Sequence, residues 1–309
     1  MQAVEASRKI EAKKRGNRLG FWFFRTSVRL FGLRGTYGFL YIVCLYYILF
    51  DQPAVADALL YVDRRLPGCN FLKKRFDVYR LFVSQGKQLI DRYAAVSEQT
   101  IFDIRLKGYD QFRALLQDSR KGLILLTAHV GNWQIAMTTL KNIGRTVYLL
   151  MQPEDNPAVQ GSLHISREQA DIKIISPEQH LGGVVEIMNV LRKGHVVSIM
   201  GDRSYGFNAV EVSFLGEKAW FPHSAFTIAA AAGCPVVVLL SAKVSAHRYV
   251  VDVSNVIYPQ YEGRRDKREQ VQLWVQKFVA MLERYISQYP YQCFLFHNVW
   301  RETTENSFG

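Results

Sequence analysis

The pattern of apolar and polar positions divides the chain into an apolar front and an alternating body. Residues 35–50 form an uncharged run of sixteen residues, which as a helix would be about 24 Å long. That length is short of the roughly 30 Å hydrocarbon core of a bilayer. The basic, aromatic stretch 21–33 before it suits the headgroup region. We therefore expect residues 19–50 to form a membrane anchor that inserts shallowly or as a hairpin.

Two other interpretations of the front remain open. Ala54-Val55-Ala56 resembles the cleavage site of a signal peptide, but some thirty-four residues precede the apolar run, which is long for an ordinary signal sequence. The run could also be an amphipathic helix buried in the protein core, which the adjacent Arg25, Arg29 and Arg34 disfavour.

The body begins with a helical pattern and continues with alternating strands and helices. In residues 70–96, apolar side chains recur at spacings of four, three, four and seven, which predicts a long amphipathic helix that covers one side of the core: Leu72, Phe76, Tyr79, Val83 and Ile90. The strands we expect are 122–129, 146–151, 172–175, 195–201, 210–214, 235–244 and 249–253. The helices we expect between and after them are 133–143, 183–192, 224–232 and 267–289.

This alternation predicts an α/β fold with a mixed, largely parallel sheet flanked by helices. The N-terminal helical, membrane-associating segment precedes it. We expect a basic N-terminal segment with membrane-associating helices at 1–69 and an α/β domain at 70–309.

Composition and charge narrow the class of protein. The 309 residues are 49% hydrophobic and 21% charged, as in ordinary globular proteins. Of the net charge of +12, the first thirty-four residues carry +7, from nine basic and two acidic side chains. Because this charge adjoins the apolar run, we expect anionic membrane lipid or an acidic carrier protein as partner rather than nucleic acid. The four cysteines form no C-x-x-C pair, which fits a reducing cytosol and disfavours a zinc knuckle or disulfide framework.

The candidate chemistry centres on His129. The sequence has no G-x-S-x-G, G-x-G-x-x-G, Walker A or H-E-x-x-H motif. His129 stands at the carboxyl end of the apolar strand 122–129, and Gly131 and Asn132 turn the chain into a helix that begins at Trp133. Ligands bind at such strand ends, and the N–H groups of the helix start can stabilise negative charge, so His129 is placed to act as a base.

Several blocks around His129 together resemble a known family. They are the stretch AHVGNWQ at 128–134, GDR at 201–203, FLG at 214–216, FP at 221–222, AAAAGCPVVV at 229–238 and PYQCFLFHNVW at 290–300. In this order and spacing the chain resembles the lysophospholipid acyltransferase superfamily, from about residue 19 to residue 300. Within it, the chain looks like the branch of lauroyl/myristoyl lipid A acyltransferases and their relatives in aryl-polyene-type gene clusters.

The resemblance implies transfer of a fatty acyl group from an acyl carrier protein or coenzyme A thioester to a hydroxyl or amine of a lipid acceptor. The acceptor would be a lipid A-like glycolipid, a lysophospholipid or a related lipid. It also implies a place at the cytoplasmic face of the bacterial inner membrane, and no metal or cofactor beyond the acyl donor. In the family a histidine is the general base and an acidic residue orients it, with spacing H-x4-[DE].

The chain departs from that spacing because Gln134 stands at the acidic position. Glutamine can accept a hydrogen bond from the His129 ring but brings no negative charge to the imidazolium. Three explanations remain open. Gln134 serves with a more acidic nucleophile, another carboxylate such as Asp202 is recruited, or catalysis is lost and the protein is a lipid-binding scaffold.

The other candidate residues are assigned to substrate binding, each with a structural alternative. By resemblance Arg203, next to Asp202, holds an anionic group of the lipid or donor, but it could equally form a structural ion pair. Asn132 contacts substrate or, as we expect, caps the following helix. Phe221 and Pro222 shape the pocket. The remaining histidines are expected to be structural or at the surface: His164, His180, His195, His223, His247 and His297.

Overall fold

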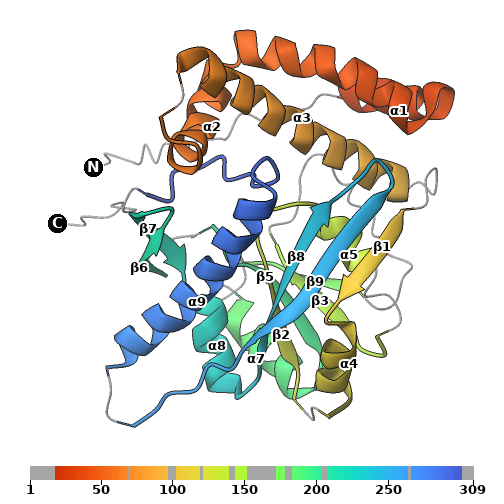
Figure 1. The fold of residues 1–309 in the computed structure, drawn as a ribbon. Helices are drawn as coiled ribbons and strands as arrows, with labels where there is room; N and C mark the ends of the chain where they lie inside the picture. The colour runs from red at the N-terminus through yellow and green to blue at the C-terminus, as the bar shows by residue number, and fades with distance from the viewer. Residues whose placement is uncertain are drawn as a thin grey trace, which may run out of the picture.

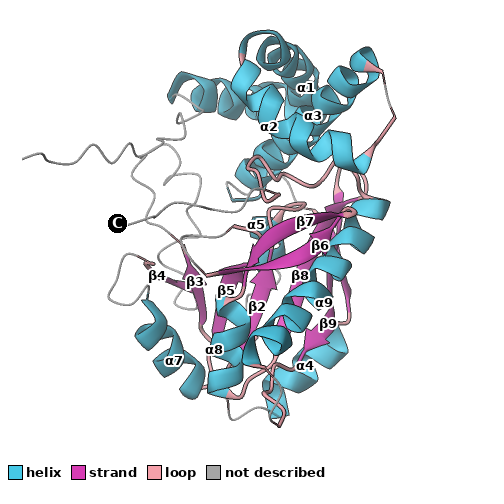
Figure 2. Cartoon of the chain, turned by 90° about the vertical axis from the view of Figure 1, so that its left-hand side faces the viewer, coloured by secondary structure: helices cyan, strands magenta, loops and turns pink. Residues whose placement is uncertain are grey.

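The computed structural model describes residues 18–68, 70–96, 102–118, 121–138, 143–151, 172–177, 183–203, 208–263 and 266–300. Three N-terminal helices lie across one end of a β-sheet that has further helices on its faces (Figures 1 and 2). The helices are α1 (Arg18–Phe50), α2 (Gln52–Arg65), α3 (Phe71–Val96), α4 (Tyr109–Asp118), α5 (Trp133–Thr138), α7 (Val184–Arg192), α8 (Ser224–Ala232) and α9 (Lys267–Gln288).

The main sheet has seven strands in the order β1-β9-β8-β2-β5-β3-β4. Every neighbouring pair is parallel except β8 with β9. The strands are β1 (Asp103–Lys107), β2 (Leu123–Thr127), β3 (Val147–Leu150), β4 (Ile172–Ile175), β5 (Val196–Met200), β8 (Val236–Lys243) and β9 (Arg248–Ile257), and a separate antiparallel ribbon is made of β6 (Ala209–Phe214) and β7 (Glu217–Pro222). The prediction of a mixed, largely parallel sheet flanked by helices is confirmed.

The central strands are buried on both faces, which is why they read as continuous apolar runs in the sequence. In β2, Ile124 and Leu126 pack into the larger core cluster, beneath α3, α8 and α9. The alternate residues Leu123 and Leu125 pack into a second cluster on the opposite face, with residues of α4 and α5. The two clusters hold β2 rigidly at the centre of the fold.

Four elements were not predicted from the sequence. The edge strand β1 has the sequence DIRLK and is largely exposed, so it lacks the apolar run that identified the others. The remaining three, α2, α4 and β7, are short and mix polar with apolar residues. Ala54 and Val55, from the signal-like tripeptide, are buried inside α2.

The front of the chain forms a helical hairpin. Gly32 has a non-helical conformation (φ 64°) that separates α1 into two helices. The rings of Phe23 and Phe39 are 5.6 Å apart, whereas a straight helix would place them about 24 Å apart. The first helix therefore folds back along the second, as the prediction of a hairpin or shallow anchor allowed.

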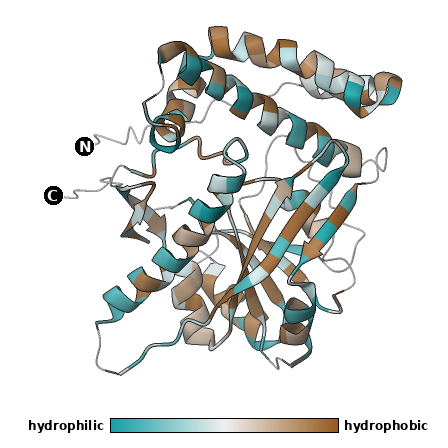
Figure 3. Cartoon of the chain, viewed as in Figure 1, coloured by the Kyte–Doolittle hydropathy of each residue, from teal (hydrophilic) through white to brown (hydrophobic). Residues whose placement is uncertain are grey.

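The outer side of α1 is an exposed apolar surface, and the inner side packs on α3. The inner side is buried at Leu33, Tyr37, Leu40, Cys44 and Ile48. The outer side exposes the set that we call the apolar face: Trp22, Leu30, Phe31, Ile42, Leu45, Tyr46, Leu49 and Phe50. Figure 3 shows hydrophobic residues along much of α1. By length and composition alone the segment Trp22–Phe50 would suffice to cross a membrane, but its helix is broken at Gly32; as folded, α1 could associate with a membrane.

The face predicted for α3 is partly wrong. Val83 and Ile90 are buried, but Leu72 and Phe76 are 76% and 58% exposed. The reason is that the side of α3 that packs on the core here carries Val78, Leu81 and Phe82, so Leu72 and Phe76 lie on the exposed side of the helix. Further along α3, Gly86 lets α1 approach closely, because a Cβ there would lie 2.5 Å from a methyl group of Leu40.

Candidate active site

Neighbouring parallel strands bring His129 and Asp202 together. Thr127 of β2 is paired with Met200 of β5, and His129 and Asp202 each follow two residues later. Adjacent strands lie about 4.8 Å apart, so the two side chains start from neighbouring positions at the carboxyl edge of the sheet. Gly201 keeps this register, because its N–H donates to the carbonyl of Thr127 over 2.8 Å.

The carboxylate of Asp202 holds His129 in two ways. The His129 backbone N–H donates to Oδ2 of Asp202 over 2.9 Å. The ring Nδ1 of His129 lies 2.9 Å from Oδ2 and 3.0 Å from Oδ1 of the same carboxylate. These contacts fix the ring in position and orientation.

Asp202 is ionised in this arrangement. Its side chain is completely buried, and burial alone would raise the pKa of the carboxyl. The charge of His129 and the ring and backbone hydrogen bonds from His129 oppose burial, and the net effect is a pKa below the ordinary value. A carboxylate can only accept hydrogen bonds, so Nδ1 of His129 carries the hydrogen in this pair.

The other side of the His129 ring is accessible. The side chain is 27% exposed, and all of its ring hydrogen bonds within the described part of the chain go from Nδ1 to Asp202. With the hydrogen on Nδ1, the neutral ring has its lone pair on Nε2. The site therefore offers a basic nitrogen at the surface of the fold, with a buried carboxylate behind it.

The loop that carries His129 is clamped by the segment near the C-terminus. The carbonyl of His129 accepts the N–H of Phe294 over 2.7 Å, and the N–H of Gly131 donates to the carbonyl of Gln292 over 2.8 Å. Gly131 has φ 53°, and a Cβ at this position would lie 1.4 Å from the carbonyl oxygen of Ser241. Only glycine fits here, which gives the Gly131 of the AHVGNWQ stretch a structural reason.

Gln134 and Asn132 do not contact the His129 ring. Gln134 is the second residue of α5, and among the described residues its side chain forms no hydrogen bond with His129. Asn132 is buried and caps α5, because its Oδ1 accepts the N–H of Ile135 over 3.3 Å. Its amide also donates to the carbonyl of Gln88 over 2.8 Å. These contacts favour the capping role over contact with substrate.

Of the residues assigned to substrate binding, Arg203 is the one with an unused polar group at the site. Its Nε is buried and makes no hydrogen bond within the described part of the chain. The carboxylate of Asp202 is engaged in its hydrogen bonds with His129. Phe221 is fully buried and packs edge-on against Phe214 at 5.3 Å, and Pro222 is also buried, so both belong to the core beside the site.

His297 is a site residue that the sequence reasoning missed. Its Nε2 donates to the backbone carbonyl of Asp202 over 2.9 Å, since a carbonyl oxygen can only accept. Burial lowers the pKa of His297, and the charge of Arg203 lowers it further, while Asp202 opposes both. His297 belongs to the stretch 290–300, one of the blocks that carry the family resemblance. The sequence of that block does not show that it lies against the end of β5.

The structure was also searched for a metal centre. Among the described residues, no group of three or more His, Cys, Asp or Glu side chains could hold a metal ion. His164 and His180 lie outside the described residues.

One comparison with known proteins decides the family. The family model for bacterial lipid A biosynthesis acyltransferases matches residues 87–302, which is more than half of the chain and includes His129 and Asp202. The chain belongs to this family. It is therefore an acyltransferase that acts on lipids, in an enzyme family that is typically membrane-associated. No curated protein matches the chain significantly.

Within the lipid A acyltransferase family model, the matched residues begin inside α3 and end after the His297 segment. All of the sheet and all residues of the candidate site are included. The α1 hairpin precedes the matched range.

Proposed function

We propose that this acyltransferase moves a fatty acyl group from an acyl carrier protein or coenzyme A thioester to a hydroxyl or amine of a lipid acceptor, with His129 as general base. The acceptor is a lipid A-like glycolipid, a lysophospholipid or a related lipid. The observation that carries the proposal is the contact of Asp202 with Nδ1 of His129, which leaves Nε2 on the exposed side of the ring.

The proposed reaction starts when Nε2 of His129 takes the proton from the acceptor hydroxyl. The oxygen attacks the thioester carbonyl, and a tetrahedral intermediate forms. The carbon–sulfur bond then breaks, the acyl ester is released, and the thiolate leaves and can take the proton back from the imidazolium. Asp202 acts as a positioning residue, because its charge stabilises the imidazolium and its hydrogen bond fixes the tautomer.

In this proposal Asp202 fills the role that the usual spacing gives to position 134. Residue 134 is then not needed to orient His129, which explains how glutamine can replace the family's acidic residue there. Arg203 is proposed to hold an anionic group of the lipid or of the donor, because its buried Nε has no partner within the described residues. The reaction needs no cofactor besides the acyl donor.

The proposed location is the cytoplasmic face of the bacterial inner membrane, where acyl donors and lipid acceptors meet. Support comes from the exposed apolar face of α1 and from the basic start of the chain, which would be attracted to anionic lipids.

The test of the proposal is acyl transfer by the purified protein. Labelled acyl carrier protein and acyl-coenzyme A are offered with a bacterial lipid extract, and labelled lipid is measured by mass spectrometry. We expect transfer by the wild type and none above background by His129→Ala. The matched control is His247→Ala, which removes an exposed imidazole elsewhere and should keep the wild-type rate. Full activity of His129→Ala would overturn the mechanism.

A second function, a lipid-binding scaffold with impaired catalysis, is favoured only by the presence of Gln134. The same assay separates the two. If the wild type is inactive while Gln134→Glu transfers acyl groups under matched conditions, the scaffold is supported; robust wild-type turnover excludes it.

A further inference from the structure

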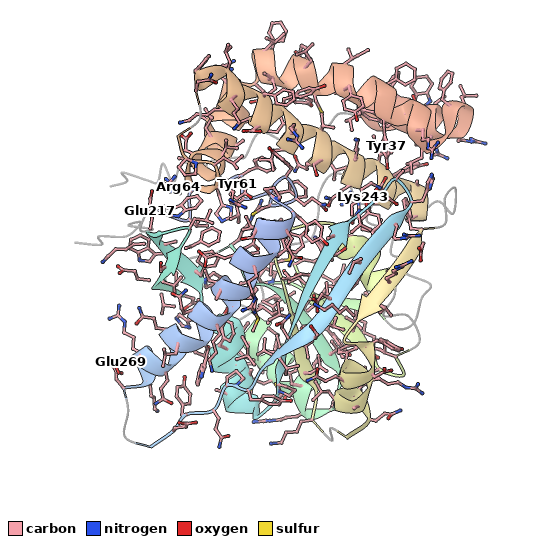
Figure 4. All side chains as sticks on the ribbon, viewed as in Figure 1. Tyr37, Tyr61, Arg64, Glu217, Lys243 and Glu269 are labelled. Carbon is pink, nitrogen blue, oxygen red and sulfur yellow. The ribbon has the colours of Figure 1, made fainter. Side chains whose placement is uncertain are left out.

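A cavity of about 500 Å³ lies between the N-terminal helices and the body of the fold, outside the His129 site. Its walls come from α1, from α3, from the connection between β8 and β9, and from the segment 291–292. Three cationic side chains line it, namely Arg80, Lys87 and Lys243. None of the described residues in its lining is acidic. Tyr37 and Lys243, labelled in Figure 4, lie in this region, with the Lys243 ammonium 5.5 Å from the centre of the Tyr37 ring.

One of the three cations, Lys243, has an acidic partner. Lys243 forms an ion pair with Asp91 of α3, which is buried and also accepts hydrogen bonds from Tyr37 and Tyr249. Burial lowers the pKa of Lys243, and the positive charge of Lys87 lowers it further, while Asp91 raises it. The ammonium nitrogens of Lys87 and Lys243 lie 5.4 Å and 5.5 Å from the centre of the same Tyr37 ring, and of the two only Lys243 is paired with a described acid.

The other two cations are held by tyrosines rather than by carboxylates. Lys87 donates to the hydroxyl of Tyr41 over 2.8 Å, and its ammonium lies 4.9 Å from the centre of that ring. Arg80 donates to the hydroxyl of Tyr291 over 3.0 Å. Neither Lys87 nor Arg80 forms a salt bridge with a described residue. The acids one turn away on α3 are Asp77 for Arg80 and Asp91 for Lys87. Asp77 accepts a hydrogen bond from Tyr291 and Asp91 pairs with Lys243, and among the described residues neither acid is within ion-pair distance of Arg80 or Lys87.

The cavity also borders the surface that could meet a membrane. Tyr41 and Phe76 line it and are 43% and 58% exposed. Ile42 and Leu45 of the apolar face follow Tyr41 along α1 and are exposed as well. An anion that enters from this side would come from the lipid layer rather than from bulk water.

We propose that this cavity binds the phosphate of an anionic phospholipid headgroup, with Lys87 and Arg80 as ligands and the acyl chains lying against the apolar face. Ammonium and guanidinium groups without acidic partners are the groups that bind phosphate in proteins. The site is separate from His129, which is not in its lining. It is joined to the His129 loop through Gln292, which lines the cavity and accepts the N–H of Gly131.

The test uses the full chain and a short-chain lipid that stays monomeric in solution, so that general attraction to a charged membrane surface does not contribute. Calorimetric titration with dihexanoyl phosphatidylglycerol is expected to saturate at one lipid per chain. Lys87→Gln and Ser84→Phe should each weaken binding by about tenfold, the first by removing a ligand charge and the second by filling the cavity without a change of charge. The matched control Lys73→Gln removes an exposed charge on the same helix and should change binding by less than about twofold.

Three outcomes would overturn the proposal. Lys87→Gln or Ser84→Phe could bind like the wild type, with unchanged thermal unfolding showing that each variant is folded. Dihexanoyl phosphatidylcholine, whose choline cation the cavity should repel, could bind as tightly as the glycerol lipid. Inorganic phosphate could bind as tightly as the lipid, which would make the site one for a soluble phosphate.

Discussion

The function of the site depends on what Asp202 does to one imidazole. The carboxylate is buried and takes both the ring Nδ1–H and the backbone N–H of His129, so ring position, tautomer and charge are set by a single residue. A glutamine at position 134 is compatible with this arrangement because the ring does not depend on it for a partner. A substitution of Asp202 would therefore change the position and basicity of Nε2 of His129 directly.

The first prediction at this scale concerns the acid stability of the fold. The folded pKa of Asp202 lies below its ordinary value of about 3.9 because the contacts with His129 outweigh burial. The ionised carboxylate therefore contributes stability that is present above the unfolded pKa and is lost as pH falls through the folded pKa. We expect the wild type to be more stable than Asp202→Asn near pH 5 and the difference to shrink below about pH 4. Urea unfolding at a series of pH values measures it; a difference already half lost at pH 5 would contradict the assignment.

His129 could be recognised from the sequence because it ends a continuous apolar strand and begins a glycine turn. Its contact with Asp202 could only be proposed as one of three possibilities. The two residues are 73 positions apart, and a sequence does not state that β2 and β5 are neighbours in the sheet. His297 was missed for the same reason, because its partner is a backbone carbonyl on a distant strand.

Among the elements, the turn after β2 is closely constrained. Gly131 combines a left-handed backbone with a close approach to Ser241, and the segment 292–294 fixes the turn from the other side. The N-terminus of α5 follows at once, capped by Asn132. The turn therefore places His129 through backbone contacts that do not depend on side-chain flexibility.

We expect Gly131→Ala to lower the free energy of unfolding by at least about 2 kcal/mol and to reduce acyl transfer. The left-handed backbone costs a non-glycine residue about 1–2 kcal/mol, and the clash with the Ser241 carbonyl adds to this. The control is Gly68→Ala, because Gly68 also has a positive φ (79°) but open space where the new Cβ would lie. It should lose about 1 kcal/mol and keep its activity. Equal losses in denaturant unfolding would show that the close approach is unimportant.

The elements that the sequence predicted are those with a strong local pattern. All of β2 is buried, and its short continuous run of apolar residues, between helical patterns, identified it as a buried strand. The edge strand β1 carries mainly polar residues because only one neighbour pairs with it, and it was missed. The prediction that Leu72 and Phe76 of α3 face the core was wrong. Helical spacing shows which apolar residues share a side of a helix, but not whether the protein core covers that side.

For the whole molecule, the three N-terminal helices form a layer across the end of the sheet where His129 lies (Figure 2). Tyr61 of α2 donates to the carbonyl of Pro290 over 2.7 Å, and Arg64 pairs with Glu217 of β7 at 2.9 Å (Figure 4). These contacts join the layer to the segment that clamps the His129 loop. A membrane bound by the apolar face would thus lie on the side of the molecule that carries the site.

The prediction at this scale is that the apolar face is required for membrane association. Ile42, Leu45 and Leu49 are 70%, 52% and 58% exposed on one side of α1, so their replacement by aspartate should leave the fold intact. Each aspartate is disfavoured in a bilayer by roughly 2–3 kcal/mol, and we expect the triple variant to move from the membrane to the soluble fraction. Leu273→Asp, at an equally exposed position on α9, should stay with the membrane. A triple variant that still sediments with membranes would refute this role for α1.

The central claim is that Asp202, rather than residue 134, is the partner of the catalytic base, and the acyl-transfer rate of two single variants tests it most directly. With labelled acyl donor and lipid extract, Asp202→Asn is predicted to lose about 10² to 10⁴ in kcat, as when an orienting carboxylate is neutralised, while Gln134→Ala changes kcat by less than about threefold. A near-normal rate for Asp202→Asn together with a large loss for Gln134→Ala would contradict the account.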